Sequence, residues 1–323
     1  MNITRGLPPA PLAAFPVLTI GNFDGQHLGH RALIEAVIEK AQCFKGVPMV
    51  LSFDPHPIEV LRPGTLPKFL SDAQEKCDFF EQLGIVELII LPFTPALAAL
   101  TPDQFVRQVL HDGLGVRQLL VGENFVFGKG RSGTIQDLVR LGGQENFEVQ
   151  PVTPVMLGGK VVSSTRIRSC VTAGNVVEGR ECLGRAYRLT STVIEGEKRG
   201  RQLGWPTANL RIPIHRVLPA DGIYATLTEI DGVCFPSVAY IGKRPTFQDG
   251  ERLLEVHVFD QRLQLYGKDI SVSFIEQVRG DMAFSHVDDL LKQMDHDGTQ
   301  AREMLEKYKD NPSHLVTANK EHG

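Results

Sequence analysis

Apolar and polar positions divide the chain into two halves with different periodicities. In the first half, short apolar runs recur about every 30 residues, which is the period of repeated βα units. Between the first two runs, Leu33, Ile34, Val37 and Ala41 follow the spacing of one helix face. The expected strands are Val17 to Ile20, Pro48 to Phe53, Val86 to Leu91, Gln118 to Val121 and Phe147 to Val152. This pattern predicts a parallel α/β sheet with ligands at the carboxyl ends of its strands.

From about Tyr187 the pattern becomes rich in β-strands. Asp231-Gly232 lies between two expected strands and is the signal of a two-residue hairpin. One long helix is expected from Val287 to Tyr308, with Gly298 as a weak point inside it. The expected strands are Tyr187 to Ile194, Ile223 to Ile230, Val233 to Ile241, Leu253 to Phe259 and Ile270 to Val278. The second half therefore predicts a small antiparallel β-barrel closed by a C-terminal helix.

The length of 323 residues favours two domains over a single core. Between the halves, Ser164 to Leu183 has the pattern of two short helices interrupted at Ala173-Gly174-Asn175. We place the domain boundary near Gly184. The expected domains are residues 1–184 and 185–310, followed by a C-terminal tail over 311–323.

Composition narrows the class of protein. The chain is 42% apolar and 22% charged, as in ordinary soluble proteins, and its net charge of −4 disfavours nucleic acid as a partner. No apolar stretch approaches the ~20 residues that span a bilayer, and the N-terminus predicts no signal peptide. Five scattered cysteines without metal-ligand spacing predict reduced thiols. We expect a soluble, cytoplasmic protein without membrane partners, either a monomer or a weak homo-oligomer.

A glycine-punctuated turn with two histidines follows the first expected strand. Gly21 and Gly25 permit tight backbone conformations, and His27 and His30 flank Gly29 where a helix is expected to begin. A helix N-terminus stabilises phosphate oxygens through its N–H groups and dipole. The turn therefore predicts a site for a nucleoside triphosphate; the alternative is a common capped loop with exposed imidazoles.

Two further segments of the first half suit anions. Ser164 or Thr165 can cap a helix, and Arg166 and Arg168 behind them offer planar donors for phosphate oxygens. The loop from Gly122 to Gly133 combines glycines with Lys129 and Arg131. The alternatives are a capped helix with a solvated basic face and a surface loop. The proline-bounded loop around His56 is a third candidate, and its alternative is a rigid turn with an exposed histidine.

Two patterns in the second half suit phosphoryl transfer. A glycine-rich basic loop from Gly196 to Gly204 can wrap a polyphosphate through its amides, or can be an ordinary β-hairpin. Thr207 and Asn209 after it supply hard oxygens suited to Mg²⁺. In the alternating strand around Val256, Glu255 and His257 share one face, so Glu255 is a candidate general base or a solvent-facing carboxylate.

The runs Gly21 to Gly25 and His27 to His30 resemble the nucleotidyltransferase signature in the form used by bacterial FAD synthetases. Gly204 to Asn209 resembles the signature of riboflavin kinases, and the two motifs stand in the order of the bifunctional riboflavin kinase and FAD synthetase family. The resemblance extends from about Val17 to Leu305. It implies a Rossmann-like nucleotidyltransferase domain and a riboflavin-kinase barrel, with riboflavin, FMN and ATP as substrates and Mg²⁺ as cofactor.

The resemblance also implies a role for each matching residue. Catalysis is expected from Glu255, His27, His30 and Arg166, and metal binding from Thr207 and Asn209. Flavin binding is expected from His56, Pro57, Phe125, Phe127, Arg279 and Phe284. ATP or phosphate binding is expected from Gly21, Phe23, Asp24, Gly25, Gly29, Asn124, Ser163, Ser164, Thr165, Arg168, Gly196, Lys198, Gly200 and Gly204.

The chain departs from the family pattern mainly in its second half. In the first half Gln26 replaces a usual Val, and in the second Ser191, Glu195, Tyr240, Lys243 and Gln264 replace usual Gly, His, Asn, Thr and Asp residues. These changes leave a second enzyme hypothesis open, in which the chain is a nucleotidyltransferase whose β domain is impaired or serves only in flavin binding. A third hypothesis is a regulatory module that binds FMN without turnover.

Overall fold

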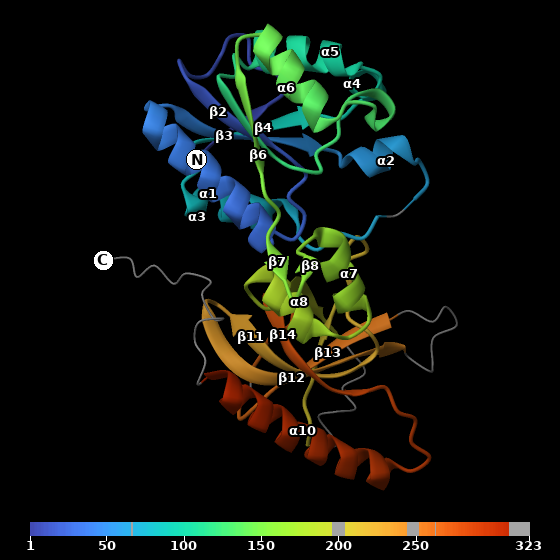
Figure 1. Ribbon diagram of the computed structural model, residues 1–323. Helices are drawn as coiled ribbons and strands as arrows, with labels where there is room; N and C mark the ends of the chain where they lie inside the picture. Colours follow the sequence, from blue (N-terminus) through green and yellow to red (C-terminus); the bar gives the residue numbers. More distant parts are fainter. Residues whose placement is uncertain (66, 196–203, 244–251, 262, 310–323) are drawn as a thin grey trace. The chain divides into compact units, whose positions relative to one another are not determined.

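The computed structural model describes residues 1–65, 67–195, 204–243, 252–261 and 263–309. The chain forms two compact units, Met1–Ser163 and Ser164–Gly323, and each is described here by itself (Figure 1). Backbone contacts group the segment 164–183 with the second unit, because its second helix packs on that unit's strands and its first helix packs on the second. The functional boundary near Gly184 remains a prediction.

The first unit is built on a six-stranded sheet in which every pairing is parallel. The strand order is β1-β4-β3-β2-β5-β6. The strands are β1 (Asn2–Arg5), β2 (Pro16–Ile20), β3 (Val47–Asp54), β4 (Glu87–Pro92), β5 (Gln118–Gly122) and β6 (Glu148–Val152). All five expected strands are confirmed. The edge strand β1 was not predicted, because its four mostly exposed residues form no apolar run.

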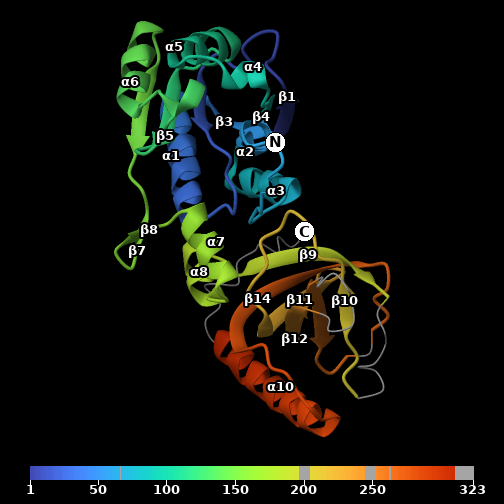
Figure 2. The ribbon, with the colours of Figure 1, turned by 90° about the vertical axis from the view of Figure 1, so that its right-hand side faces the viewer.

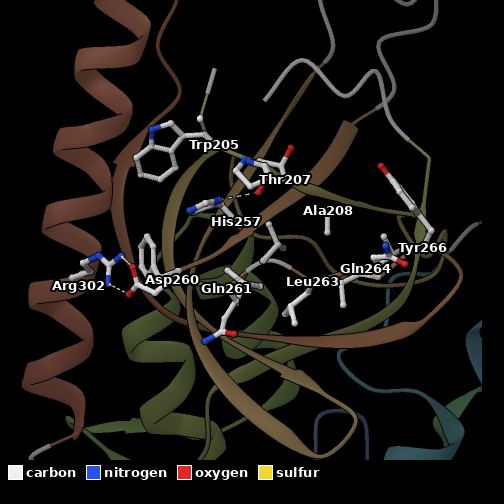
Figure 3. A pocket seen from close by; sticks show the side chains of 17 residues that line it. Trp205, Thr207, Ala208, His257, Asp260, Gln261, Leu263, Gln264, Tyr266 and Arg302 are labelled. Atoms are coloured by element: carbon white, nitrogen blue, oxygen red, sulfur yellow. Dashed lines mark hydrogen bonds and ion pairs between the residues drawn. The ribbon is translucent and has the colours of Figure 1, made fainter. Parts of the chain in front are cut away.

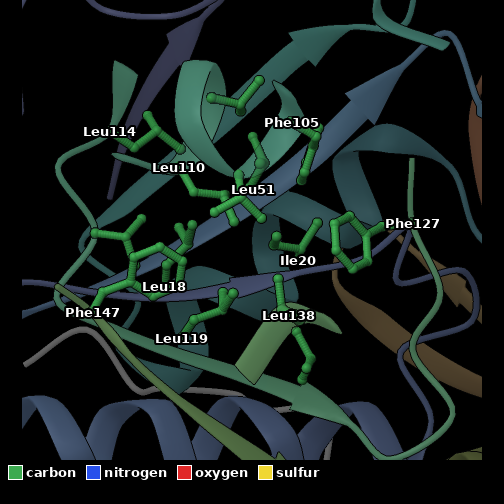
Figure 4. Packing of buried hydrophobic residues seen from close by; sticks show 14 of the residues in the cluster. Leu18, Ile20, Leu51, Phe105, Leu110, Leu114, Leu119, Phe127, Leu138 and Phe147 are labelled. Carbon is green, nitrogen blue, oxygen red and sulfur yellow. The ribbon is translucent and has the colours of Figure 1, made fainter. Parts of the chain in front are cut away.

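Alternate strand residues supply a core on each face of this sheet. Val17, Val50 and Leu88 pack with residues of α1 and α3, whereas Leu18, Leu51 and Leu119 pack with α5, η1 and α6 on the other face (Figure 4). The helical elements are α1 (Leu28–Phe44), α2 (Pro57–Leu61), α3 (Ala73–Leu83), α4 (Pro95–Ala98), α5 (Pro102–Phe105), the π-helix η1 (Val106–Gly113), the 3₁₀-helix η2 (Lys129–Arg131) and α6 (Ile135–Gln144). A hairpin of β7 (Met156–Leu157) and β8 (Lys160–Val161) follows.

The second unit contains the predicted antiparallel barrel, closed in the order β10-β13-β12-β11-β14-β9 (Figure 2). Its strands are β9 (Tyr187–Ile194), β10 (Ala208–Leu210), β11 (Gly222–Ile230), β12 (Val233–Lys243), β13 (Arg252–Val258) and β14 (Asp269–Gly280). The hairpin between β11 and β12 turns at Asp231 and Gly232, whose φ angles of 50° and 80° are those of a left-handed turn. The three-residue β10 is too short to show a period of two and was not predicted.

Three helices complete the described part of the second unit. The two predicted short helices are α7 (Ser164–Thr172) and α8 (Val176–Leu183), and the predicted C-terminal helix is α10 (Val287–Lys309). Figures 1 and 2 both show α10 along the outside of the barrel, where Ala301, Leu305 and Tyr308 pack against Ala225 and Ile275. Over the described ranges, no helix combines the length and apolarity needed to cross a bilayer.

Two candidate active sites

The histidine turn begins α1 in the first unit. His27 is the N-cap, and its Nδ1 accepts a hydrogen bond from the His30 backbone N–H at 3.2 Å. Because Nδ1 accepts, the proton of a neutral His27 ring is on Nε2, which then serves as a donor. The His27 and His30 rings are stacked, with centroids 3.6 Å apart, and an added Cβ on Gly29 would lie 3.1 Å from the His27 ring. The turn therefore presents two imidazoles as one group.

Positive φ angles shape the residues before this helix. Phe23, Gly25 and Gln26 have φ angles of 48°, 86° and 42°, and a non-glycine residue in that region costs about 1–3 kcal/mol. Hydrogen bonds of a buried network offset this conformational cost. Asp24 accepts hydrogen bonds from the N–H groups of Leu70 and Ser71 at 2.9 and 3.1 Å. The Ser71 hydroxyl accepts hydrogen bonds from the Gly25 N–H and the Gln26 side-chain amide, at 2.9 and 2.5 Å.

The turn opens on a cavity of about 230 Å³. Of the residues expected to bind ATP or flavin, those at this cavity come from the turn itself and from the end of β5. They are Gly21, Phe23, His27, Gly29, His30, Asn124 and Phe125. Asp24 is not part of the wall, because its 3% exposed carboxylate faces the 70–71 backbone. The turn and Asn124 are thus brought together, as expected for parallel strands that end at one sheet edge.

Most of the other residues predicted to bind flavin in the first unit form a helix N-terminus or part of the apolar core. His56 caps α2: its Nδ1 accepts the Ile58 N–H at 3.2 Å, and Pro57 is the first helical residue. His56 also packs on Phe69, with ring centroids 5.1 Å apart. Phe127 is 6% exposed and belongs to the apolar core, whereas Phe125 covers it and reaches the cavity. Only Phe125 of the two therefore faces the site.

The arginine segment lies where the two units meet in the sequence. Ser163 ends the first unit, whereas Ser164, Thr165, Arg166 and Arg168 lie on α7 of the second. The Arg166 guanidinium donates to Glu178 Oε1 from Nε and Nη2, at 2.9 and 2.8 Å, and this bond raises its pKa. Arg166 is therefore a fixed cation on α7.

The second unit has a cavity of about 1130 Å³ at the end of the barrel. Figure 3 shows Trp205, Thr207 and His257 on one wall and Gln264 and Tyr266 on another. The wall between β13 and β14 was missed by the sequence analysis, apart from Gln264. The polar, aliphatic and aromatic residues of this irregular loop have no periodicity that would have revealed the wall.

Contacts with β13 and α10 hold the segment that carries Thr207. His257 Nδ1 lies 2.8 Å from the Pro206 carbonyl, which can only accept, so Nδ1 carries the proton. Burial lowers the pKa of His257, which favours its neutral form. Trp205 packs on His257 with ring centroids 4.6 Å apart and donates from Nε1 to Asp295 at 3.1 Å. Thr207 is thereby held at the cavity.

A row of side chains on the outer face of the barrel contains three predicted site residues. Directly opposed residues of antiparallel strands share a face. The adjacent residues Leu210, Leu254 and Ile241 are buried, so the row itself faces outward. From β10 to β14 the row is Asn209, Glu255, Tyr240, Ile223 and Arg279. The structure thus brings the candidate base next to a candidate metal ligand.

Arg279 and Phe284 form a cation–π pair, the Arg279 platform, at the far end of this row. The Arg279 guanidinium donates from Nε and Nη2 to the buried Asp297 of α10, at 3.0 and 2.8 Å. Its Cζ lies 5.8 Å from the centroid of the Phe284 ring. A fixed planar cation and an aromatic ring are both groups that stack on a planar heterocycle.

Some predicted residues lie outside the described ranges or outside the cavity. Gly196, Lys198 and Gly200 are not described, whereas Gly204 lines the larger cavity. Among the departures from the family pattern, Ser191 donates its hydroxyl to the Arg211 carbonyl, and Glu195 and Lys243 are exposed. Gln264 lines the cavity and Tyr240 lies in the outer row, so these two departures lie at the candidate site.

The fold and sites define a class: a nucleotidyltransferase-like α/β unit joined to a flavokinase-like barrel. A sequence model of the FAD synthetase family matches residues 13–166, and one of the riboflavin kinase family matches residues 183–305. The bifunctional riboflavin kinase/FMN adenylyltransferase of Pseudomonas fluorescens is 38% identical over 305 residues, covering 94% of this chain and 97% of that protein. The protein of that name from Escherichia coli (strain K12) is 35% identical over 293 residues, covering 90% and 92%.

One solved structure extends the likeness to the fold. A Streptococcus pneumoniae protein, described as a macrolide-efflux protein, is 29% identical with a TM-score of 0.82, covering 91% of this chain and 95% of that chain. The chain belongs to the family of bifunctional riboflavin kinase/FMN adenylyltransferases. The resemblance inferred from the motifs is therefore confirmed, and nothing favours the hypothesis of an impaired kinase barrel.

Proposed function

We propose that this chain phosphorylates riboflavin to FMN with one ATP and adenylylates FMN to FAD with a second, releasing pyrophosphate. The observation that carries the proposal is that each family match falls largely on one compact unit with its own cavity and candidate residues. Five free cysteines and the absence of a described spanning helix support action in the cytoplasm, without a membrane partner.

In the kinase step, Glu255 accepts the proton of the terminal ribityl hydroxyl while that oxygen attacks the γ-phosphorus of ATP. A carboxylate can act as the base because the hydroxyl becomes more acidic as the new P–O bond forms. The larger cavity beside Thr207 has room for ATP. Arg279 and Phe284 hold the flavin ring at the other end of the row.

The donor set beside the kinase cavity fits Mg²⁺. Thr207 lines the cavity and the buried Asn209 lies next to Glu255 in the barrel sheet, so hard oxygens are available where ATP phosphates would lie. Families of this kind use ATP, generally with a divalent metal. Bound there, Mg²⁺ would neutralise charge on the phosphates. Thr207 and Asn209 would hold the ion and thereby fix its distance from Glu255.

In the adenylyl step, an FMN phosphate oxygen attacks the α-phosphorus of ATP and pyrophosphate leaves. His27 and His30 donate to the departing phosphates at the N-terminus of α1. No covalent enzyme intermediate is needed, because positioning and charge stabilisation suffice. Asn124 and Phe125 supply the neighbouring wall for nucleotide and flavin.

A product time course tests the proposal. Purified protein given riboflavin, ATP and Mg²⁺ should form FMN first and FAD later, with one pyrophosphate released per FAD. Separation of flavins by liquid chromatography measures both products. Formation of neither product would refute the proposal, and formation of FAD only from supplied FMN would restrict the function to the first unit.

A further inference from the structure

Tyr240 occupies a central position in the outer row of the barrel, between the proposed base and the flavin platform. It lies directly opposite Glu255 of β13 and opposite Ile223 of β11. Residues opposed in an antiparallel pair have Cβ atoms about 4.5–5.5 Å apart, so the Tyr240 side chain starts beside the Glu255 side chain. The mechanism above assigns no role to this phenol.

The position of the Tyr240 ring is fixed by its neighbours. Its Oη lies over Gly242, where an added Cβ would be 2.0 Å away, so only glycine leaves room for the ring in this place. The hydroxyl donates to Asp281 Oδ1 at 3.3 Å. Burial and the nearby Asp281 carboxylate raise the pKa of Tyr240 to about 12, so the phenol is a neutral donor at assay pH. The half-buried ring is thus held in one place.

The length of the row matches the shape of the proposed substrate. Three strand spacings of ~4.8 Å separate Glu255 from Arg279, which is about 14 Å along the barrel surface. Riboflavin carries its reacting hydroxyl at one end of a ribityl chain and its planar rings at the other. With the hydroxyl at Glu255 and the rings at the Arg279 platform, the chain must cross Tyr240 and Ile223.

We infer that Tyr240 is a positioning residue for the kinase step, whose ring supports the ribityl chain between Glu255 and the Arg279 platform. The inference rests on the proposed function and deepens it. A flavin with a shorter hydroxyalkyl chain cannot reach Glu255 across this ring while its own rings remain on the platform. Tyr240 therefore makes the site selective for acceptors with a full-length polyol chain.

The test compares riboflavin with a flavin that carries a shortened hydroxyalkyl chain. Tyr240→Ala should raise the KM for riboflavin about tenfold and lower its kcat/KM advantage over the short-chain flavin by a similar factor, with the KM for ATP unchanged. Tyr240→Phe keeps the ring and should retain most of the selectivity while losing the bond to Asp281. Val233→Ala, an exposed position at the start of the same strand, is the matched control.

Two results would overturn the inference: unchanged riboflavin KM and selectivity in Tyr240→Ala, or an equal loss of selectivity in Tyr240→Phe. Fluorescence of the single tryptophan, Trp205, shows whether the barrel of each variant is folded. Failure of the proposed function is distinguishable, because wild-type protein would then make no FMN. Quenching of flavin fluorescence still measures riboflavin binding in that case, and equal affinities of wild type and Tyr240→Ala would reject the inference alone.

Discussion

The Ser71 hydroxyl shows how single polar atoms set the geometry of the histidine turn. A hydroxyl has one donor and two acceptor positions, and Ser71 uses all three. It donates to Asp24 at 3.3 Å and accepts from the Gly25 N–H and the Gln26 amide. At 3% exposure no bulk water can replace these bonds. The hydroxyl therefore stabilises the positive φ angles of the residues that precede His27.

We predict that Ser71→Ala lowers both the stability of the first unit and FMN adenylylation. The substitution removes the hydroxyl that accepts hydrogen bonds from the buried Gly25 N–H and the Gln26 amide, and the loss of buried hydrogen bonds of this kind costs about 1–3 kcal/mol. Hydrogen exchange of the β2 and α1 amides measures the loss, and FAD formation from supplied FMN measures the function. Riboflavin phosphorylation should be unaffected. Ser132→Ala, at an exposed site of the same unit, is the control; equal protection of these amides in the two variants would contradict the prediction.

Residue identity alone could not separate binding side chains from supporting ones. Asp24 and Phe127 lie in loops next to expected phosphate and flavin residues, and the sequence offers no reason to treat them differently from His27 or Phe125. The folded chain separates them by burial and partner: Asp24 bonds the 70–71 backbone, and Phe127 packs in the core. Such assignments depend on contacts about 46 residues away in sequence, which local patterns do not contain.

At the scale of elements, periodicity identified the long helices and strands but not how they pair. The expected core strands and α10 all formed, because each carries enough apolar residues to show a period. β10 has three residues, yet it places Asn209 opposite Glu255 and so completes the outer row. Strand register depends on partners distant in sequence, so the row itself was not predictable.

Gly298 in α10 is a second feature whose role depends on a partner distant in sequence. As a sequence feature it weakens α10, since glycine costs ~1 kcal/mol relative to alanine in a helix interior. In the structure Gly298 is buried under Trp205, and an added Cβ would lie 2.5 Å from Cη2 of the indole. The glycine is therefore the site where the Trp205 segment, and with it Thr207, packs closely on α10.

We predict that Gly298→Ala destabilises the second unit by about 1–3 kcal/mol despite the better helix propensity, because the indole must move. Emission of the single tryptophan should shift to the red, and riboflavin phosphorylation should fall as Thr207 is displaced. Gly143→Ala is the matched control, since Gly143 is an exposed helical glycine with open space around its Cβ position. Equal thermal midpoints for Gly298→Ala and wild type would refute the packing argument.

On the scale of the whole molecule, the two units hold chemically consecutive sites. The product proposed for the barrel is the acceptor proposed for the histidine turn, and each step uses its own ATP. The cavity at the histidine turn is lined by residues of the first unit and the barrel cavity by residues of the second, so the two cavities can be disabled separately. The two reactions should therefore be separable by mutation, and FMN can pass between them through solution.

Mixing two inactivated variants tests this separation. Glu255→Ala should form no FMN from riboflavin yet still convert supplied FMN to FAD, because its histidine turn is intact. His30→Ala should accumulate FMN and form FAD at least about 100-fold more slowly, since a donor to the leaving pyrophosphate is lost.

When the two variants are mixed with riboflavin and ATP, FAD formation should be restored after a lag, because FMN must diffuse from one molecule to another. The lag should shorten as the protein concentration rises. Loss of both reactions in either variant would show that the sites are not independent, and a mixture that accumulates FMN without forming FAD would show that FMN does not pass through solution.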